Sequence, residues 1–359
     1  MPDLGSDGMA RTIFIHIGLH KTGSTAIQVA FDGYAGEKLV YPHLGDANQS
    51  IALVNAFTQT PETYRQNVLL GHDRQTIDTI RSTTRKTLFS QLKKDQRDIL
   101  LSGEELIILT QDEVNEMRDA LSPHTDQFKI IVFVRDPVDY CNSAFAEILK
   151  HGRMKFQIPQ PKFRPAIEKY QIAFGHEAVQ AVHLTPGVDS VAAISAIMGI
   201  DPPPKPKMTA NPTLSLPACR IFFSVNTLLS EYEPPQRRAM ARKLLKHASD
   251  FEGPRLAFSP DLLRDHLDHE DIQWLDENFG ITFDVETTLA KIDTATAVTS
   301  ENDLAMTGED RQRLASVLNL AEASDAAILR AADKVLYGSR FNKLRTAVKS
   351  ALKRPFSST

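Results

Sequence analysis

The sequence predicts an α/β protein with a doubly wound parallel sheet, helical insertions and a mainly helical C-terminal region. Three observations favour this class. Short apolar, β-branched runs alternate with longer segments of helical pattern, as parallel strands and crossover helices do. The run Lys129–Val134 is continuously apolar after its lysine, which is typical of a strand buried on both faces. The proline-rich linker Asp201–Pro206 is followed by mostly helical patterns.

The first half of the chain supplies the sheet. A strand is predicted at Thr12–Ile17, and a helix from Ser24 to about Ala35. The other predicted elements are a short strand at 38–42, a mainly helical segment at 47–94 with turns near Thr60-Pro61 and Gly71, and strands at 98–102, 129–134 and 178–184.

The second half is predicted to be helical. Its expected helices cover about 215–231, 234–250, 259–279 and 309–336. We therefore expect an α/β core at 10–200 and a mainly helical C-terminal region at 207–359, joined by the proline-rich linker.

Composition limits the classes of function. The 359 residues have a net charge of −4, which gives no reason to expect nucleic-acid binding. Two cysteines, Cys141 and Cys219, cannot form a disulfide framework, and Cys141 is expected to be a small core residue. No run is long enough for a transmembrane helix, and no signal peptide is recognisable, so we expect a cytoplasmic protein without a transmembrane segment.

The segment Ile13–Thr25 is the most informative part of the sequence. An apolar run ends at Gly18, and a loop then brings one lysine, one glycine and three hydroxyl residues to the start of a helix. Backbone N–H groups at such a junction bind phosphate, helped by the helix dipole. The pattern G-x-x-x-x-G-K-[ST] of nucleotide triphosphatases almost fits, but Ser24 follows Gly23, and Lys21 lies two residues before it. Lys21 is therefore predicted to reach a bridging oxygen between two transferable groups.

At these residues the chain resembles the sulfotransferases that use 3′-phosphoadenosine 5′-phosphosulfate (PAPS). Their phosphosulfate loop reads hydrophobic strand and then [PH]-K-[ST]-G-[ST]-[ST], which His20–Thr25 matches at every position. The resemblance covers roughly residues 10–200 and implies a P-loop-like sheet with PAPS as the sulfuryl donor. The residues it implies for the 5′-phosphosulfate end are Lys21, Thr22, Gly23, Ser24 and Thr25.

A second motif follows the predicted strand Lys129–Val134. Arg135 comes directly after this strand, where open α/β sheets bind their ligands, and Asp136-Pro137 is a helix-start signal. Ser143 lies about two turns into that helix. The family's 3′-phosphate motif is a strand, R-[DN]-P, and a serine eight positions after the arginine, so the resemblance implies that Arg135 and Ser143 bind the 3′-phosphate.

Sulfuryl transfer to a hydroxyl or amine also needs a base at the end of a neighbouring strand. Ser102-Gly-Glu-Glu105 follows the strand predicted at 98–102 and resembles the Ser-x-Glu element of bacterial and carbohydrate sulfotransferases. Glu104 fits that spacing. Glu105 and His20 stay open as alternatives, although Lys21 beside His20 disfavours a protonatable base there.

We therefore predict a PAPS-dependent sulfotransferase that acts on a hydroxyl of a carbohydrate or glycolipid, with Lys21 opposing charge on the leaving phosphate oxygen. No metal is expected, because the transferred group has little charge to neutralise. Two alternatives remain: a P-loop kinase-like phosphotransferase, and a non-catalytic nucleotide-binding protein of the same fold. The acceptor and the oligomeric state stay open.

Two other segments contain clustered charged residues that could form a site. The residues Asp265, His266, Asp268, His269 and Glu270 match no zinc-protease pattern, and a solvated acidic helix face is the preferred interpretation. The basic segment Phe341–Arg354 either rests as a helix on an anionic membrane surface or partner, or packs on its own domain, which we prefer.

Overall fold

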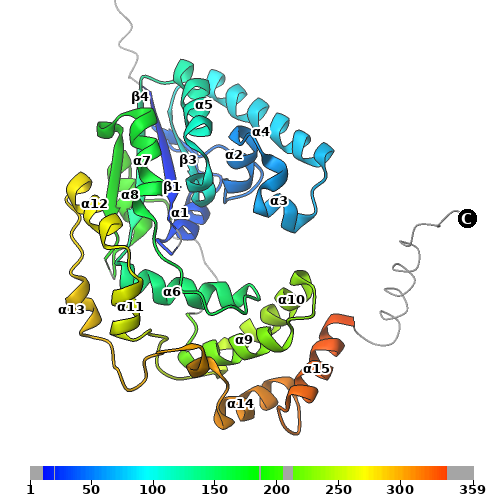
Figure 1. Cartoon of the computed structure of the whole chain (residues 1–359). Helices are drawn as coiled ribbons and strands as arrows, with labels where there is room; N and C mark the ends of the chain where they lie inside the picture. Colours follow the sequence, from blue (N-terminus) through cyan, green and yellow to red (C-terminus); the bar gives the residue numbers. More distant parts are fainter. Residues whose placement is uncertain (1–10, 20, 186, 205–212, 338–359) are drawn as a thin grey trace, which may run out of the picture. The chain divides into compact units, whose positions relative to one another are not determined.

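The computed structural model describes residues 11–19, 21–185, 187–204 and 213–337, and the chain divides into two compact units (Figure 1). Unit 1 comprises Met1–Pro137, Pro161–Thr209 and Asp268–Phe283, and unit 2 comprises Val138–Gln160, Ala210–Leu267 and Asp284–Thr359. Each unit is thus built from three segments, whereas the sequence suggested one boundary between residues 200 and 207. A local sequence pattern predicts a helix or a strand, but it does not predict which unit that helix packs into.

Unit 1 contains one sheet of five parallel strands in the order β2-β3-β1-β4-β5. The strands are β1 (Thr12–Gly18), β2 (Leu39–Val40), β3 (Asp98–Gly103), β4 (Gln127–Val134) and β5 (Val179–His183). The predicted α/β class with a parallel sheet is therefore confirmed. Every residue of β1 is buried, because β1 lies in the middle of the sheet, where Ile15 is in register with Leu101 and Ile130.

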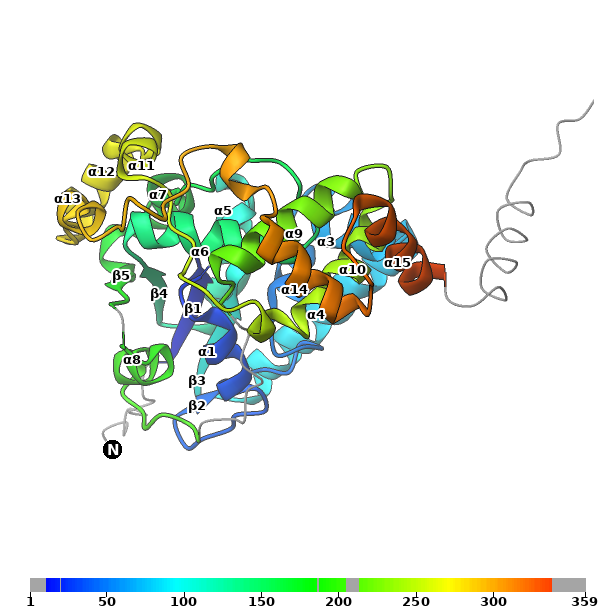
Figure 2. The same cartoon turned by 90° about the horizontal axis from the view of Figure 1, so that it is seen from below.

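Helices cover both faces of this sheet. The helices α1 (Ser24–Phe31) and α8 (Ser190–Met198) pack on the face that carries Phe14, Leu100 and Ile131. Figure 2 shows α1 and α8 on one side of the strands, and α5 (Gln111–Leu121) and α7 (Phe163–Phe174) on the other. The carboxyl ends of all five strands meet at one edge, since the strands are parallel.

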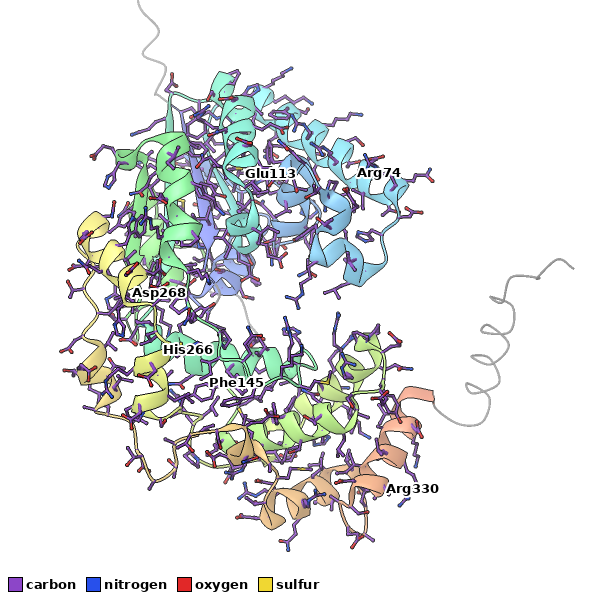
Figure 3. All side chains as sticks on the ribbon, viewed as in Figure 1. Arg74, Glu113, Phe145, His266, Asp268 and Arg330 are labelled. Atoms are coloured by element: carbon purple, nitrogen blue, oxygen red, sulfur yellow. The ribbon has the colours of Figure 1, made fainter. Side chains whose placement is uncertain are left out.

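The predicted helical segment at 47–94 is divided as the turn signals indicated. Its elements are α2 (Ser50–Phe57), the 3₁₀ turn η1 (Pro61–Thr63), α3 (Arg65–Leu70) and α4 (Arg74–Lys94). Gly71 ends α3 in a left-handed conformation (φ 67°), and the side chain of Asp73 caps α4 by accepting from the Thr76 N–H. Further along the chain, after β3, Thr110 and Glu113 form a capping box at the start of α5. Glu113 is labelled in Figure 3.

The regular elements among the described residues of unit 2 are helices, joined by loops and two isolated β-bridges. Its helices are α6 (Pro137–Lys150), which starts on the last residue of unit 1's first segment, α9 (Leu216–Leu228), α10 (Pro234–Leu245), α11 (Pro260–His266), α13 (Val285–Leu289), α14 (Gly308–Leu318) and α15 (Asp325–Tyr337). Phe145 of α6 (labelled in Figure 3) packs edge-on against Phe156 and Phe258, with ring centroids 6.0 and 5.1 Å away. The buried Cys141 lies on the same helix, as predicted for a core residue.

Several predicted helices were too long, among them the one predicted at 234–250, where α10 ends at Leu245. The helix predicted from Ser24 to Ala35 ends at Phe31. The one predicted at 259–279 is α11 followed by α12 (His269–Phe279, in unit 1), because the Asp268 side chain accepts from the Asp271 N–H and starts a new helix. The one predicted at 309–336 is α14 and α15, because Asn319 ends α14 in a left-handed conformation (φ 53°).

Short 3₁₀ turns complete the described chain at η2 (Glu104–Ile108), η3 (Ser122–His124), η4 (His176–Ala178), η5 (Ala248–Asp250) and η6 (Glu301–Leu304). Within the described ranges, no helix combines the length and the apolar character that crossing a membrane requires. The basic segment Phe341–Arg354 lies outside the described residues, as does the end of the predicted linker.

Candidate functional site

The predicted phosphate loop joins β1 to α1 in unit 1. It begins after Gly18, and α1 starts at Ser24 with Gly23 as its N-cap. Lys21 (φ 67°) and Gly23 (φ 80°) both have left-handed backbones. The buried Thr22 hydroxyl donates to the Leu19 carbonyl at 2.5 Å, which braces the loop from inside. His20 lies outside the described residues, so its candidacy as the base stays a prediction.

The start of α1 leaves its first N–H groups without partners inside the helix. The Gly23 carbonyl accepts from the Ala26 and Ile27 N–H groups at 3.0 and 3.3 Å, so the helical ladder begins there. The first N–H groups of a helix have no partner within the helix, and the helix dipole concentrates positive charge at this end. The amides of Ser24 and Thr25 are therefore suited to an anion.

Gly18 shows how closely two predicted functional residues approach each other. A Cβ atom on Gly18 would lie 2.6 Å from the Ser24 Oγ and 2.6 Å from the Glu104 Cβ. These two atoms are therefore no further apart than twice that distance, and only glycine leaves room for both. The structure thus brings the phosphate loop and the candidate base together at the carboxyl end of β1.

The Ser24 hydroxyl is buried without a hydrogen-bond partner among the described residues. Ser24 is 3% exposed, and its Oγ makes no hydrogen bond to any described residue. Buried polar groups are normally hydrogen-bonded, because desolvation without compensation destabilises the fold. An unsatisfied hydroxyl at a helix N-terminus is what a site for a phosphate oxygen would contain.

Glu104 and Glu105 have different surroundings, although they are adjacent at the start of η2. The Glu105 carboxylate accepts from the Tyr64 hydroxyl, and from the Gln66 amide at 2.9 Å. Burial and this hydrogen bond to Glu105 raise the pKa of Tyr64 well above its ordinary value, so Tyr64 stays a donor. Glu105 is therefore engaged as an acceptor for Tyr64 and Gln66, and the choice of the base among Glu104, Glu105 and His20 stays a prediction.

A residue that the sequence did not single out also contacts the loop. Ser190, the first residue of α8, donates from its hydroxyl to the Gly23 carbonyl at 3.3 Å, and its Oγ lies 2.6 Å from where a Gly23 Cβ would be. The Asp189-Ser190 pair is recognisable in sequence as a helix start, but its contact with a loop 167 residues away is not.

The predicted 3′-phosphate motif is reproduced locally. Arg135 directly follows the last residue of β4, and α6 begins at Pro137. Ser143 lies six residues further along α6, where its hydroxyl donates to the Tyr140 carbonyl at 3.2 Å. Arg135 belongs to unit 1 and Ser143 to unit 2, so their joint contact with one phosphate stays a prediction.

The described part of the chain contains no candidate metal centre. Nowhere in residues 11–19, 21–185, 187–204 and 213–337 do three or more histidine, cysteine, aspartate or glutamate side chains gather as a metal site would require.

Comparison with known proteins adds no assignment: no protein-family model matches the chain, and no curated protein sequence matches it.

Proposed function

We propose that the protein is a PAPS-dependent sulfotransferase that transfers a sulfuryl group to a hydroxyl of a carbohydrate or glycolipid. The observation that supports this proposal most is that the Ser24 Oγ and the Glu104 Cβ both lie beside Gly18. It supports a site where an anion-binding loop and a carboxylate base act on one reacting group, at the strand end where α/β sheets bind ligands.

The residues of the loop fit the 5′-phosphosulfate end of PAPS. The unsatisfied Ser24 hydroxyl and the first amides of α1 would bind phosphate oxygens, and Gly23 leaves space beside Ser190. We also propose that the sheet is P-loop-like, since the loop follows the central strand and leads directly into α1.

The chemistry divides between Glu104 and Lys21. PAPS would supply an activated sulfuryl group, whose sulfur forms a bond to the acceptor oxygen as its bond to the bridging phosphate oxygen breaks. Glu104 would take the proton of the acceptor hydroxyl. Lys21 would stabilise the negative charge on the leaving phosphate oxygen, which is a preorganised electrostatic role. Arg135 and Ser143 would hold the 3′-phosphate.

Calorimetry with adenosine 3′,5′-bisphosphate and AMP tests the cofactor assignment. We expect the bisphosphate to bind at least about tenfold more tightly, because charge-assisted hydrogen bonds from Arg135 add about 1.5–3 kcal/mol. Arg135→Ala should remove most of this preference. Arg74→Ala is the matched control, since Arg74 is an exposed arginine on α4 (Figure 3). Equal affinity of the native protein for both nucleotides would refute the assignment.

Turnover distinguishes the alternatives. Magnesium-dependent ATP hydrolysis without PAPS binding would identify a kinase-like phosphotransferase. Tight binding of the bisphosphate without transfer to any hydroxyl or to water would identify a non-catalytic nucleotide-binding protein.

A further inference from the structure

A pair of buried polar side chains lies under the candidate site, on the face of the sheet that α1 and α8 cover. His16 of β1 is fully buried and is in register with Ser102 of β3, which is fully buried too. The His16 Nδ1 lies 2.8 Å from the Ser102 Oγ.

The hydrogen bond of this pair joins two neutral groups. Burial lowers the pKa of His16 to about 4, so the ring is neutral at pH 7. Its Nδ1 can donate or accept, because the Ser102 hydroxyl can do either. The His16 Nε2 is buried without a hydrogen-bond partner among the described residues, so within them Ser102 is the group that holds the ring.

Ser102 is anchored through its backbone as well. Its N–H donates to the Gln49 side chain at 2.9 Å, and its carbonyl accepts from the Gln49 N–H at 3.2 Å. The edge strand β2 has only two residues, so Gln49 occupies the place beside Ser102 where a longer β2 would pair. The end of β3 is thus held by side-chain hydrogen bonds and not by a neighbouring strand alone.

Glu104 lies between this anchor and a second one. On its other side the Glu105 N–H donates to the Ser50 Oγ at 3.2 Å, and the Glu105 carboxylate is held by Tyr64 and Gln66. Gly103, between Ser102 and Glu104, has no side chain to contribute. The orientation of the Glu104 backbone beside Gly18 therefore depends on how firmly Ser102 and Glu105 are held.

We propose that His16 and Ser102 are positioning residues for the base Glu104, acting as a buried hydrogen-bonded pair that fixes the end of β3. This inference rests on the proposed sulfotransferase function. The pair does not exchange protons with the acceptor. It fixes the geometry in which Glu104 meets the acceptor hydroxyl, and a small misplacement of a catalytic group lowers the rate strongly.

Nitrogen-15 NMR of histidine-labelled protein tests the pair without any ligand. We expect the His16 ring to be neutral at pH 7, and its Nδ1 resonance to move in Ser102→Ala, because Nδ1 then loses its hydrogen-bond partner. A charged His16 ring at pH 7, or an Nδ1 resonance unchanged in Ser102→Ala, would overturn the assigned pair.

Hydrolysis of PAPS, with water as the acceptor, tests the positioning role. We expect Ser102→Ala to lower kcat by about 10- to 100-fold while the Kd of adenosine 3′,5′-bisphosphate stays at its native value. His16→Asn and His16→Leu form a matched pair of similar size. The asparagine amide nitrogen is as many bonds from Cβ as Nδ1 is, so His16→Asn should retain a higher kcat than His16→Leu.

The outcomes separate this inference from the proposed function. A native protein that hydrolyses PAPS, with Ser102→Ala equal to it in kcat, would refute the positioning role and leave the sulfotransferase assignment standing. A native protein that neither binds nor hydrolyses PAPS would refute both. If His16→Leu fails to fold, Ser102→Ala decides the matter, because it removes a single oxygen atom.

Discussion

Substitution of Gly18 by alanine tests the geometry on which the site depends. The added methyl group would lie 2.6 Å from the Glu104 Cβ, 2.6 Å from the Ser24 Oγ and 2.8 Å from the Glu104 Cα. Ordinary contacts begin at 3.4 Å, so the neighbouring atoms must move by most of an ångström. One of them is a backbone atom next to β3, which cannot rotate away as a flexible side chain can.

The magnitude follows from that displacement. Forcing a methyl group into a packed site destabilises a protein by about 1–3 kcal/mol. The same movement displaces Glu104 and Ser24, and a misplacement of about 1 Å can lower the rate by about 100-fold. We therefore expect Gly18→Ala to lower the free energy of unfolding, measured by urea titration, and to lower PAPS hydrolysis by a larger factor than the loss of folded protein explains.

Gly308→Ala is the control for this substitution. Gly308 begins α14, and an added Cβ would meet nothing within 4 Å there. We expect its unfolding free energy to stay the same or to rise slightly, because alanine favours a helix more than glycine does. If Gly18→Ala behaved like Gly308→Ala in both assays, the close approach of Glu104 and Ser24 to Gly18 would be wrong.

Four further predictions follow from the site. Glu104→Gln should keep nucleotide affinity and lose about 10²–10⁴-fold in the rate of PAPS hydrolysis, and a near-native rate would assign the base elsewhere, with His20→Ala as the next variant. Glu105→Gln should lose about 1–3 kcal/mol of unfolding free energy, because Tyr64 and Gln66 lose a charged acceptor, and an inactive but fully stable variant would contradict this. Lys21→Gly should relieve the left-handed backbone (φ 67°) and raise the thermal midpoint while lowering kcat by about 10²–10³-fold, so a less stable variant would show that Lys21 is not strained. Burial lowers the pKa of His16 to about 4 in the folded state, so between about pH 6.5 and pH 4 the unfolded state binds a proton that the folded state does not. Acidification through that range should therefore lower the unfolding free energy of the native protein by about 3 kcal/mol more than that of His16→Leu. Parallel pH profiles of the two proteins would refute the burial of a neutral His16.

The sequence by itself determined the class of the fold and the local form of each motif. The mainly apolar runs predicted all five strands, because a strand buried on both faces consists mostly of apolar residues. The positions of Lys21, Gly23 and Ser24 at a strand–helix junction, and of Arg135 directly after β4, also follow from local pattern. Helix ends were less accurate, since a single capping side chain such as Asp268 divides a periodic segment.

Only the tertiary structure decided which of these residues meet. Sequence spacing favours Glu104 through the Ser-x-Glu element, but only the structure shows that Tyr64 and Gln66, from another segment, hold the Glu105 carboxylate. The contact of Ser190 with Gly23 and the hydrogen bond between His16 and Ser102 join residues 167 and 86 positions apart. Such contacts depend on the order of strands in the sheet and on the packing of helices against it. Strand order and helix packing arise when the apolar residues of all the segments are buried together, so no single segment of the sequence predicts them.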